Sequence, residues 1–137
     1  MNTSVERFIL AAIPGGIIWG WLSMVVNSVS GAFAFEGSFV HDLTTFATGG
    51  AIFGVLVAGF LSLMGDKLPF KSRLLRAVFV STSLWILLRI GGALLSHMDN
   101  ERYHIVTSQT IQGFFMAIIL GCILYPLWKK ESVDQAM

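Results

Sequence analysis

One arginine, Arg89, lies inside a run of the chain, Ala77–Ser96, that contains no other charged residue. A charged side chain at the centre of a membrane span costs at least about 2.5–3.5 kcal/mol, so it usually marks a function or a specific partner. The planar guanidinium could hold a carboxylate or a phosphate headgroup through two hydrogen bonds. The alternatives are snorkelling to the outer headgroups, contact with another subunit, and an internal ion pair with an acidic loop residue. The acidic residues expected in the outer loops are Glu36, Asp42, Asp99 and Glu101.

Several uncharged polar residues are expected close to the depth of Arg89. Residues three, four and seven apart share one helix face, and the helical rise of 1.5 Å per residue places Arg89 and Gln112 about 10 Å below the outer edge of the hydrocarbon. The inner halves of the first, second and fourth apolar runs are almost purely hydrocarbon. This pattern predicts a pocket open to the outer face. Its candidate ligand-binding residues are Arg89, Gln112, Gln109, Thr48, Ser23 and Asn27.

Three histidines, His41, His97 and His104, are expected at the outer ends of the helices. Imidazole together with carboxylate suits zinc or copper, so they form a candidate metal site. Their spacing matches no known metal-ligand motif, and interfacial histidines are common.

No catalytic motif is present, and we expect neither an enzyme nor a cofactor. The chain has no nucleophile elbow, phosphate-binding loop or dinucleotide fingerprint. The single cysteine, Cys122, cannot close an internal disulfide and is expected to be a small apolar packing residue.

The composition indicates that a lipid bilayer surrounds these residues. Of 137 residues, 55% are apolar and only 12% are charged, against roughly 25% charged in soluble domains. Only helices and closed barrels satisfy backbone groups in lipid, and the apolar runs lack the alternation of barrel strands. We therefore expect an all-α integral membrane protein, with residues 1–137 forming a single transmembrane domain. Its predicted helices span about 8–29, 43–65, 75–96 and 105–128, with Pro126 ending the last.

The distribution of charge predicts how the bundle is oriented. Seven basic residues fall at the termini and in the loop 66–76, whereas the other two connections hold one, Arg102. By the positive-inside rule, both termini and the basic loop are expected in the cytoplasm, in an antiparallel four-helix transmembrane bundle of a bacterial-type inner membrane.

Glycines at small-xxx-small spacing predict close helix packing. A short internal echo, residues 15–20 against 49–54, indicates either an inverted repeat or this packing pattern alone. The second and third helices are expected to approach closely in the outer half, whereas Gly65 should tolerate substitution. The glycines assigned to helix packing are Gly16, Gly20, Gly50, Gly54, Gly92 and Gly113.

By hydropathy and glycine spacing, the chain resembles only the broad class of small bacterial four-helix inner-membrane proteins, a resemblance that assigns no functional residue. The leading expectation is a non-enzymatic accessory or scaffold subunit that packs with a larger membrane complex or with copies of itself. The alternative is a small transporter or a lipid- or solute-binding protein that uses the outer pocket around Arg89. Membrane lipids and other membrane subunits are the expected partners, and nucleic acid is not.

Overall fold

The computed structural model describes residues 3–32, 35, 37–96 and 108–136, and these residues form a four-helix bundle. All four helices are long and apolar enough to cross a membrane, which confirms the predicted all-α fold with four span-like helices. A short 3₁₀ turn, η1 (Gly65–Lys67), follows the second helix. The helices are α1 (Thr3–Ser30), α2 (Phe39–Met64), α3 (Arg73–Ser96) and α4 (Ser108–Ala136).

Local sequence signals account for the helix ends on one side of the bundle. Gly31 has a φ of 65°, the left-handed conformation that commonly ends a helix, and its N–H donates to the Asn27 carbonyl. Ser38 caps α2, because its hydroxyl accepts a hydrogen bond from the His41 N–H.

The prediction that Pro126 ends the fourth helix is wrong. The helix continues through Pro126 to Ala136. A proline inside a helix removes one backbone hydrogen bond and crowds the carbonyl four residues earlier, but it does not prevent the residues that follow, which include Leu127, Lys129 and Glu131 and are acceptable in a helix, from continuing it.

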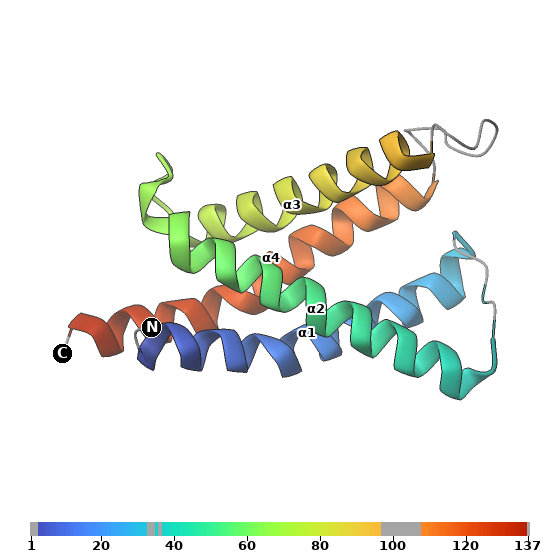
Figure 1. Ribbon diagram of the computed structural model, residues 1–137, viewed down its shortest axis with the longest axis horizontal. Coiled ribbons are helices and arrows are strands. Elements are labelled where there is room, and N and C mark those ends of the chain that lie inside the picture. Colours follow the sequence, from blue (N-terminus) through green and yellow to red (C-terminus); the bar gives the residue numbers. More distant parts are fainter. Residues whose placement is uncertain (1–2, 33–34, 36, 97–107, 137) are drawn as a thin grey trace.

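The helices associate as two pairs joined through α4. Figure 1 shows α3 beside α4 and α1 beside α2. The α1 helix also packs against α4, whereas α2 and α3 touch much less extensively than the helices within either pair. The two pairs therefore leave a space between α2 and α3.

The closest backbone approach in the bundle joins α1 to α2 at glycines. A Cβ at Gly16 would overlap the Gly50 carbonyl oxygen, and a Cβ at Gly50 would overlap that of Gly16. A Cβ at Gly20 would overlap the Phe46 carbonyl, and one at Gly54 would lie 2.7 Å from the Ala12 carbonyl. Glycine is thus required here because two backbones occupy the space of its missing side chain.

The predicted close approach of the second and third helices is wrong. A Cβ at Gly49, Gly91 or Gly92 would meet nothing within 4 Å, and Gly50 faces α1. Adjacent residues of a helix point about 100° apart, so Gly49 points away from the contact that Gly50 makes with α1. Matched depth alone does not identify which helix a glycine contacts.

The α1–α2 contact also explains the echo between residues 15–20 and 49–54. An offset of 34 residues exchanges Gly16 with Gly50, and it exchanges the Gly20–Phe46 contact with the Gly54–Ala12 contact. The two helices therefore meet through a locally two-fold arrangement of their backbones.

A dense apolar core fills the end of the bundle near η1. Trp128 is 3% exposed, and the Arg73 guanidinium carbon lies 5.8 Å from its ring centroid. The prediction that Gly65 tolerates substitution is wrong, because its Cβ would lie 2.6 Å from the Trp128 ring. Arg76 stabilises the turn, because its guanidinium donates hydrogen bonds to the Phe70 carbonyl and to the Asp66 carboxylate. The core residues are Phe8, Ala12, Phe53, Val57, Ala58, Leu61, Ala77, Val80, Leu120, Leu124 and Trp128.

We predict that Gly50→Ala destabilises the bundle and that Gly59→Ala does not. The Gly50 methyl would force α1 and α2 apart, at a cost typical of overpacking, about 1–3 kcal/mol. Gly59 is the matched control on the same helix, since a Cβ there meets nothing within 4 Å. The free energy of unfolding in mixed micelles measures the difference. Equal stability of the two variants would contradict the close backbone contact.

Candidate functional site

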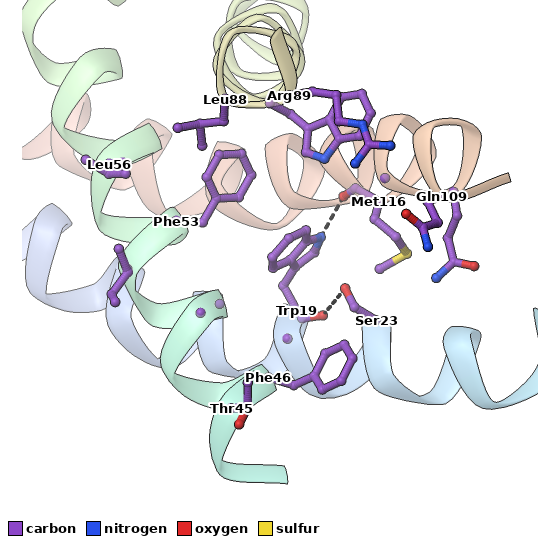
Figure 2. A pocket seen from close by; sticks show the side chains of 17 residues that line it. Trp19, Ser23, Thr45, Phe46, Phe53, Leu56, Leu88, Arg89, Gln109 and Met116 are labelled. Carbon is purple, nitrogen blue, oxygen red and sulfur yellow. Dashed lines mark hydrogen bonds between the residues drawn. The ribbon is translucent and has the colours of Figure 1, made fainter. Parts of the chain in front are cut away.

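A cavity of about 630 Å³ lies between the four helices, within the 300–1,000 Å³ usual for small-molecule sites. Figure 2 shows the side chains around it. We call it the α2–α3 groove. Its lining residues are Trp19, Gly20, Ser23, Thr45, Phe46, Gly49, Gly50, Ile52, Phe53, Leu56, Trp85, Leu88, Arg89, Gln109, Gln112, Gly113 and Met116.

The groove opens between α2 and α3, where these helices diverge. Its exposed lining residues belong to these two helices; Ile52 on α2 is 58% exposed and Leu88 on α3 is 55% exposed. The α1 and α4 residues form the floor, where Gly20 and Met116 are buried. In a chain that spans a membrane, such an opening faces the hydrocarbon of the bilayer.

The groove is polar at one end and apolar along the rest. In Figure 2 the Arg89 and Gln109 side chains and the Ser23 hydroxyl lie toward one side, with Phe53, Leu56 and Leu88 on the other. Arg89 is the single charged residue among the described lining residues, which include no carboxylate, histidine or cysteine. The arrangement therefore suits an amphipathic molecule with a polar end near Arg89.

Two tryptophans have their ring positions determined by neighbouring helices. Trp19 Nε1 donates to the Met116 carbonyl over 2.6 Å, and its ring centroid lies 5.4 Å from that of Phe53. Trp85 packs on α4 so closely that a Cβ at Gly113 would overlap its ring. Contacts with neighbouring helices therefore fix the positions of two aromatic rings in the groove lining.

The structure brings four of the six predicted ligand-binding residues to the groove. Ser23, Arg89, Gln109 and Gln112 line it. Thr48 is exposed and Asn27 is 1% exposed, and neither is among the lining residues. Stripes three or four residues apart are too broad to separate the groove wall from the adjoining faces.

Sequence reasoning missed the α2 wall of the groove. The spacing of four, three and four residues that joins Thr45, Gly49, Ile52 and Leu56 places them on one helix face. The spacing is visible in the sequence, but these residues are mostly apolar, and the predicted site was composed of polar residues.

The two glutamines of the groove also connect α4 to the end of α1. Gln109 Nε2 donates to the Ala32 carbonyl over 3.0 Å, and the Ser30 hydroxyl donates to Gln112 Oε1. Ser23 uses its hydroxyl within its own helix, donating to the Trp19 carbonyl. The glutamines therefore connect α4 to the end of α1 at the polar end of the groove. Arg89 supplies the positive charge of that end.

Arg89 is half-buried, and it lines the groove rather than the outer surface of α3 alone. Of its predicted acidic partners, Asp42 lies 3.6 Å from the neighbouring His41, measured from Oδ1 to Nδ1. The other three, Glu36, Asp99 and Glu101, lie outside the described residues.

The structure offers no support for the candidate metal site within the residues it describes. His41 is exposed, and the described part of the chain contains no group of three potential ligands that could hold a metal ion. His97 and His104 lie outside the described residues.

Cys122, expected to be a packing residue, is exposed on α4, because its neighbour Gly121 is the residue that faces α3.

Comparison with known proteins finds no matching family model, no similar curated protein and no similar solved structure.

A double-mutant cycle tests the connection between α1 and α4. We predict that Ser30→Ala and Gln112→Ala are coupled by about 0.5–1.5 kcal/mol, the usual net value of one hydrogen bond. Ser28→Ala with Gln112→Ala is the control cycle, because the Ser28 hydroxyl donates to carbonyls of its own helix. Unfolding free energies in mixed micelles provide the measurement, and equal coupling in both cycles would contradict the assignment.

Proposed function

We propose that this protein binds an amphipathic membrane molecule in the α2–α3 groove, as a small lipid-binding protein or transporter. The observation that carries the proposal is a sideways-opening cavity with an arginine at one end and aromatic and aliphatic side chains along the rest. A ligand dissolved in the bilayer can reach such a site without crossing water. Its apolar part would replace lipid contacts with Phe53, Leu56 and Leu88.

The length of the groove supports an occupant from one leaflet. Its α2 wall runs from Thr45 to Leu56, which corresponds to about 16 Å at the helical rise. This is about half of a 30 Å hydrocarbon core. The buried apolar core near η1 fills the other part of the bundle, so the proposed site belongs to the leaflet on the side of the α1–α2 connection.

We further propose that the four helices cross a bacterial inner membrane in alternating directions, with both termini in the cytoplasm. The contacts Gly20–Phe46 and Gly54–Ala12 support opposite directions for α1 and α2. Lys67, Lys71 and the other basic residues at the same end support cytoplasmic placement. In this topology the groove belongs to the outer leaflet.

The second candidate function is the accessory or scaffold subunit expected from the sequence. One observation favours it: Cβ positions at Gly59 and Gly91 meet nothing within 4 Å, so a helix of another protein could approach α2 or α3 closely. In contrast, four polar residues line the groove of the isolated chain, as a pocket-containing protein requires: Ser23, Arg89, Gln109 and Gln112. The groove is therefore the better supported site.

Filling the groove should prevent ligand entry without unfolding the bundle. We predict that Gly49→Phe lowers quenching of Trp19 and Trp85 by brominated phosphatidylcholine several-fold, because the new ring would occupy space next to these tryptophans. Gly59→Phe is the matched control, since both glycines lie on α2 with open space at the Cβ and only Gly49 lines the groove. A Trp21→Phe background removes the signal of an exposed tryptophan. Unchanged quenching in Gly49→Phe would overturn the proposed binding site.

Reporter fusions test the proposed topology. A fluorescent protein that folds only in the cytoplasm should be active at both termini, and alkaline phosphatase should be active after residues 38 and 100. Seven basic residues on one side against one on the other set this expectation. An external C-terminus would contradict the proposed orientation and, with it, the placement of the groove in the outer leaflet.

A further inference from the structure

The charge and shape of the α2–α3 groove indicate the chemical class of its occupant. We infer that the groove binds an anionic phospholipid, with the headgroup phosphate at Arg89 and one acyl chain along the apolar wall. This inference rests on the proposed function, since it names the ligand of the same site.

Charge complementarity is the first argument. Arg89 brings the single formal charge among the described lining residues, and a positively charged side chain in a binding site favours an anionic ligand over a neutral or a cationic one. The planar guanidinium matches the geometry of a phosphate through two parallel hydrogen bonds. Such charge-assisted bonds are roughly twice as strong as neutral ones.

The position of the charge is the second argument. In Figure 2 Arg89 and Gln109 lie on the same side of the groove, and Gln109 is the second residue of α4. The polar end of the groove therefore extends from the helix ends, near the headgroup level of a bilayer, to the Arg89 backbone, which lies about 10 Å before the end of α3 at the helical rise. A long arginine side chain can extend toward that level while its stem stays among apolar residues.

The dimensions of the groove are the third argument. A cavity of about 630 Å³ that is open between α2 and α3 can receive one chain of a lipid while the rest of the molecule remains in the bilayer. The wall formed by Phe53, Ile52, Leu56 and Leu88 offers only apolar contacts along this path. Phospholipids are also the most abundant amphiphiles that a lateral opening meets, so mass action favours them over scarcer ligands.

Quenching of tryptophan by brominated lipids provides the test. The full chain, with Trp21→Phe, is placed in vesicles of one fixed mixture of phosphatidylcholine and phosphatidylglycerol. Bromine is carried by the phosphatidylglycerol chains in one preparation and by an equal amount of phosphatidylcholine in the other. Because the surface charge is the same in both, a difference in quenching of Trp19 and Trp85 reports selection at the groove.

We expect phosphatidylglycerol to be preferred about tenfold, which corresponds to about 1.4 kcal/mol. Arg89→Gln should abolish the preference, and Arg89→Lys should reduce it, because lysine keeps the charge but loses the two-bond geometry. Lys71→Gln is the control for charge removal away from the groove, as Lys71 is exposed near η1, and it should leave the preference unchanged.

The possible outcomes separate the two proposals. Equal quenching by both lipids, with loss of quenching in Gly49→Phe, would overturn the anionic selectivity and leave the binding groove intact. Quenching that Gly49→Phe does not change would overturn the groove itself. A preference retained in a folded Arg89→Gln, or lost equally in Lys71→Gln, would show that Arg89 does not select the headgroup. If Arg89→Gln fails to fold, the reduced preference expected for Arg89→Lys decides the question, and an unchanged preference there would overturn the inference.

Discussion

The backbone contact between α1 and α2 is the constraint on which the rest of the structure depends. Gly16 and Gly50 face each other so closely that neither position has room for a methyl group. Lipid is as apolar as the helix side chains, so helices in a membrane gain little from burying apolar surface, and close packing of small residues takes over that role. Because the glycine face of α2 packs against α1, that face is not available for close packing against α3.

The groove follows from this choice of neighbours. The α3 helix packs on α4, where the Ser81 hydroxyl donates to the buried Ala117 carbonyl over 2.7 Å and Gly121 lies against Val78. The α1 and α4 helices then connect the two pairs through the Trp19–Met116 hydrogen bond and the bonds of Gln109 and Gln112. The α2 and α3 helices diverge toward one end, and the divergence leaves the cavity between the four helices.

The two ends of the bundle differ in what fills them. Near η1, Trp128 closes the space between the helices, with Gly65 against one part of its ring and Arg73 beside it. At the other end no comparably large buried side chain is found among the described residues, and the space is lined by Arg89, Ser23 and two glutamines. A bundle closed at one end and grooved at the other is suited to binding within one leaflet rather than to conduction through the whole membrane.

The sequence by itself determined four helices long and apolar enough to cross a membrane, and the gathering of polar residues near one end. These properties depend on local quantities: hydropathy along a run, the helical period and the rise per residue. The rise per residue placed Ser23, Arg89, Gln109 and Gln112 in the same outer half of the bundle, and these residues do line one groove. It also identified Gly16 and Gly50 as packing residues, since small-residue spacing is itself a local pattern.

Only the tertiary structure decided which helix each face meets. Gly49 and Gly50 are equally small and almost equally deep, yet a Cβ at Gly49 would meet nothing within 4 Å, whereas one at Gly50 would overlap the backbone of α1. The sequence identifies Gly65 only as a loop residue, whereas in the structure it lies against Trp128, which is distant in sequence. Thr48 and Asn27 do not line the groove for the same reason. One helix face can border two neighbouring helices, and only packing decides which residues of that face meet each neighbour. Local sequence specifies what a face can contact, and the competition among four helices for the closest fit decides what it does contact.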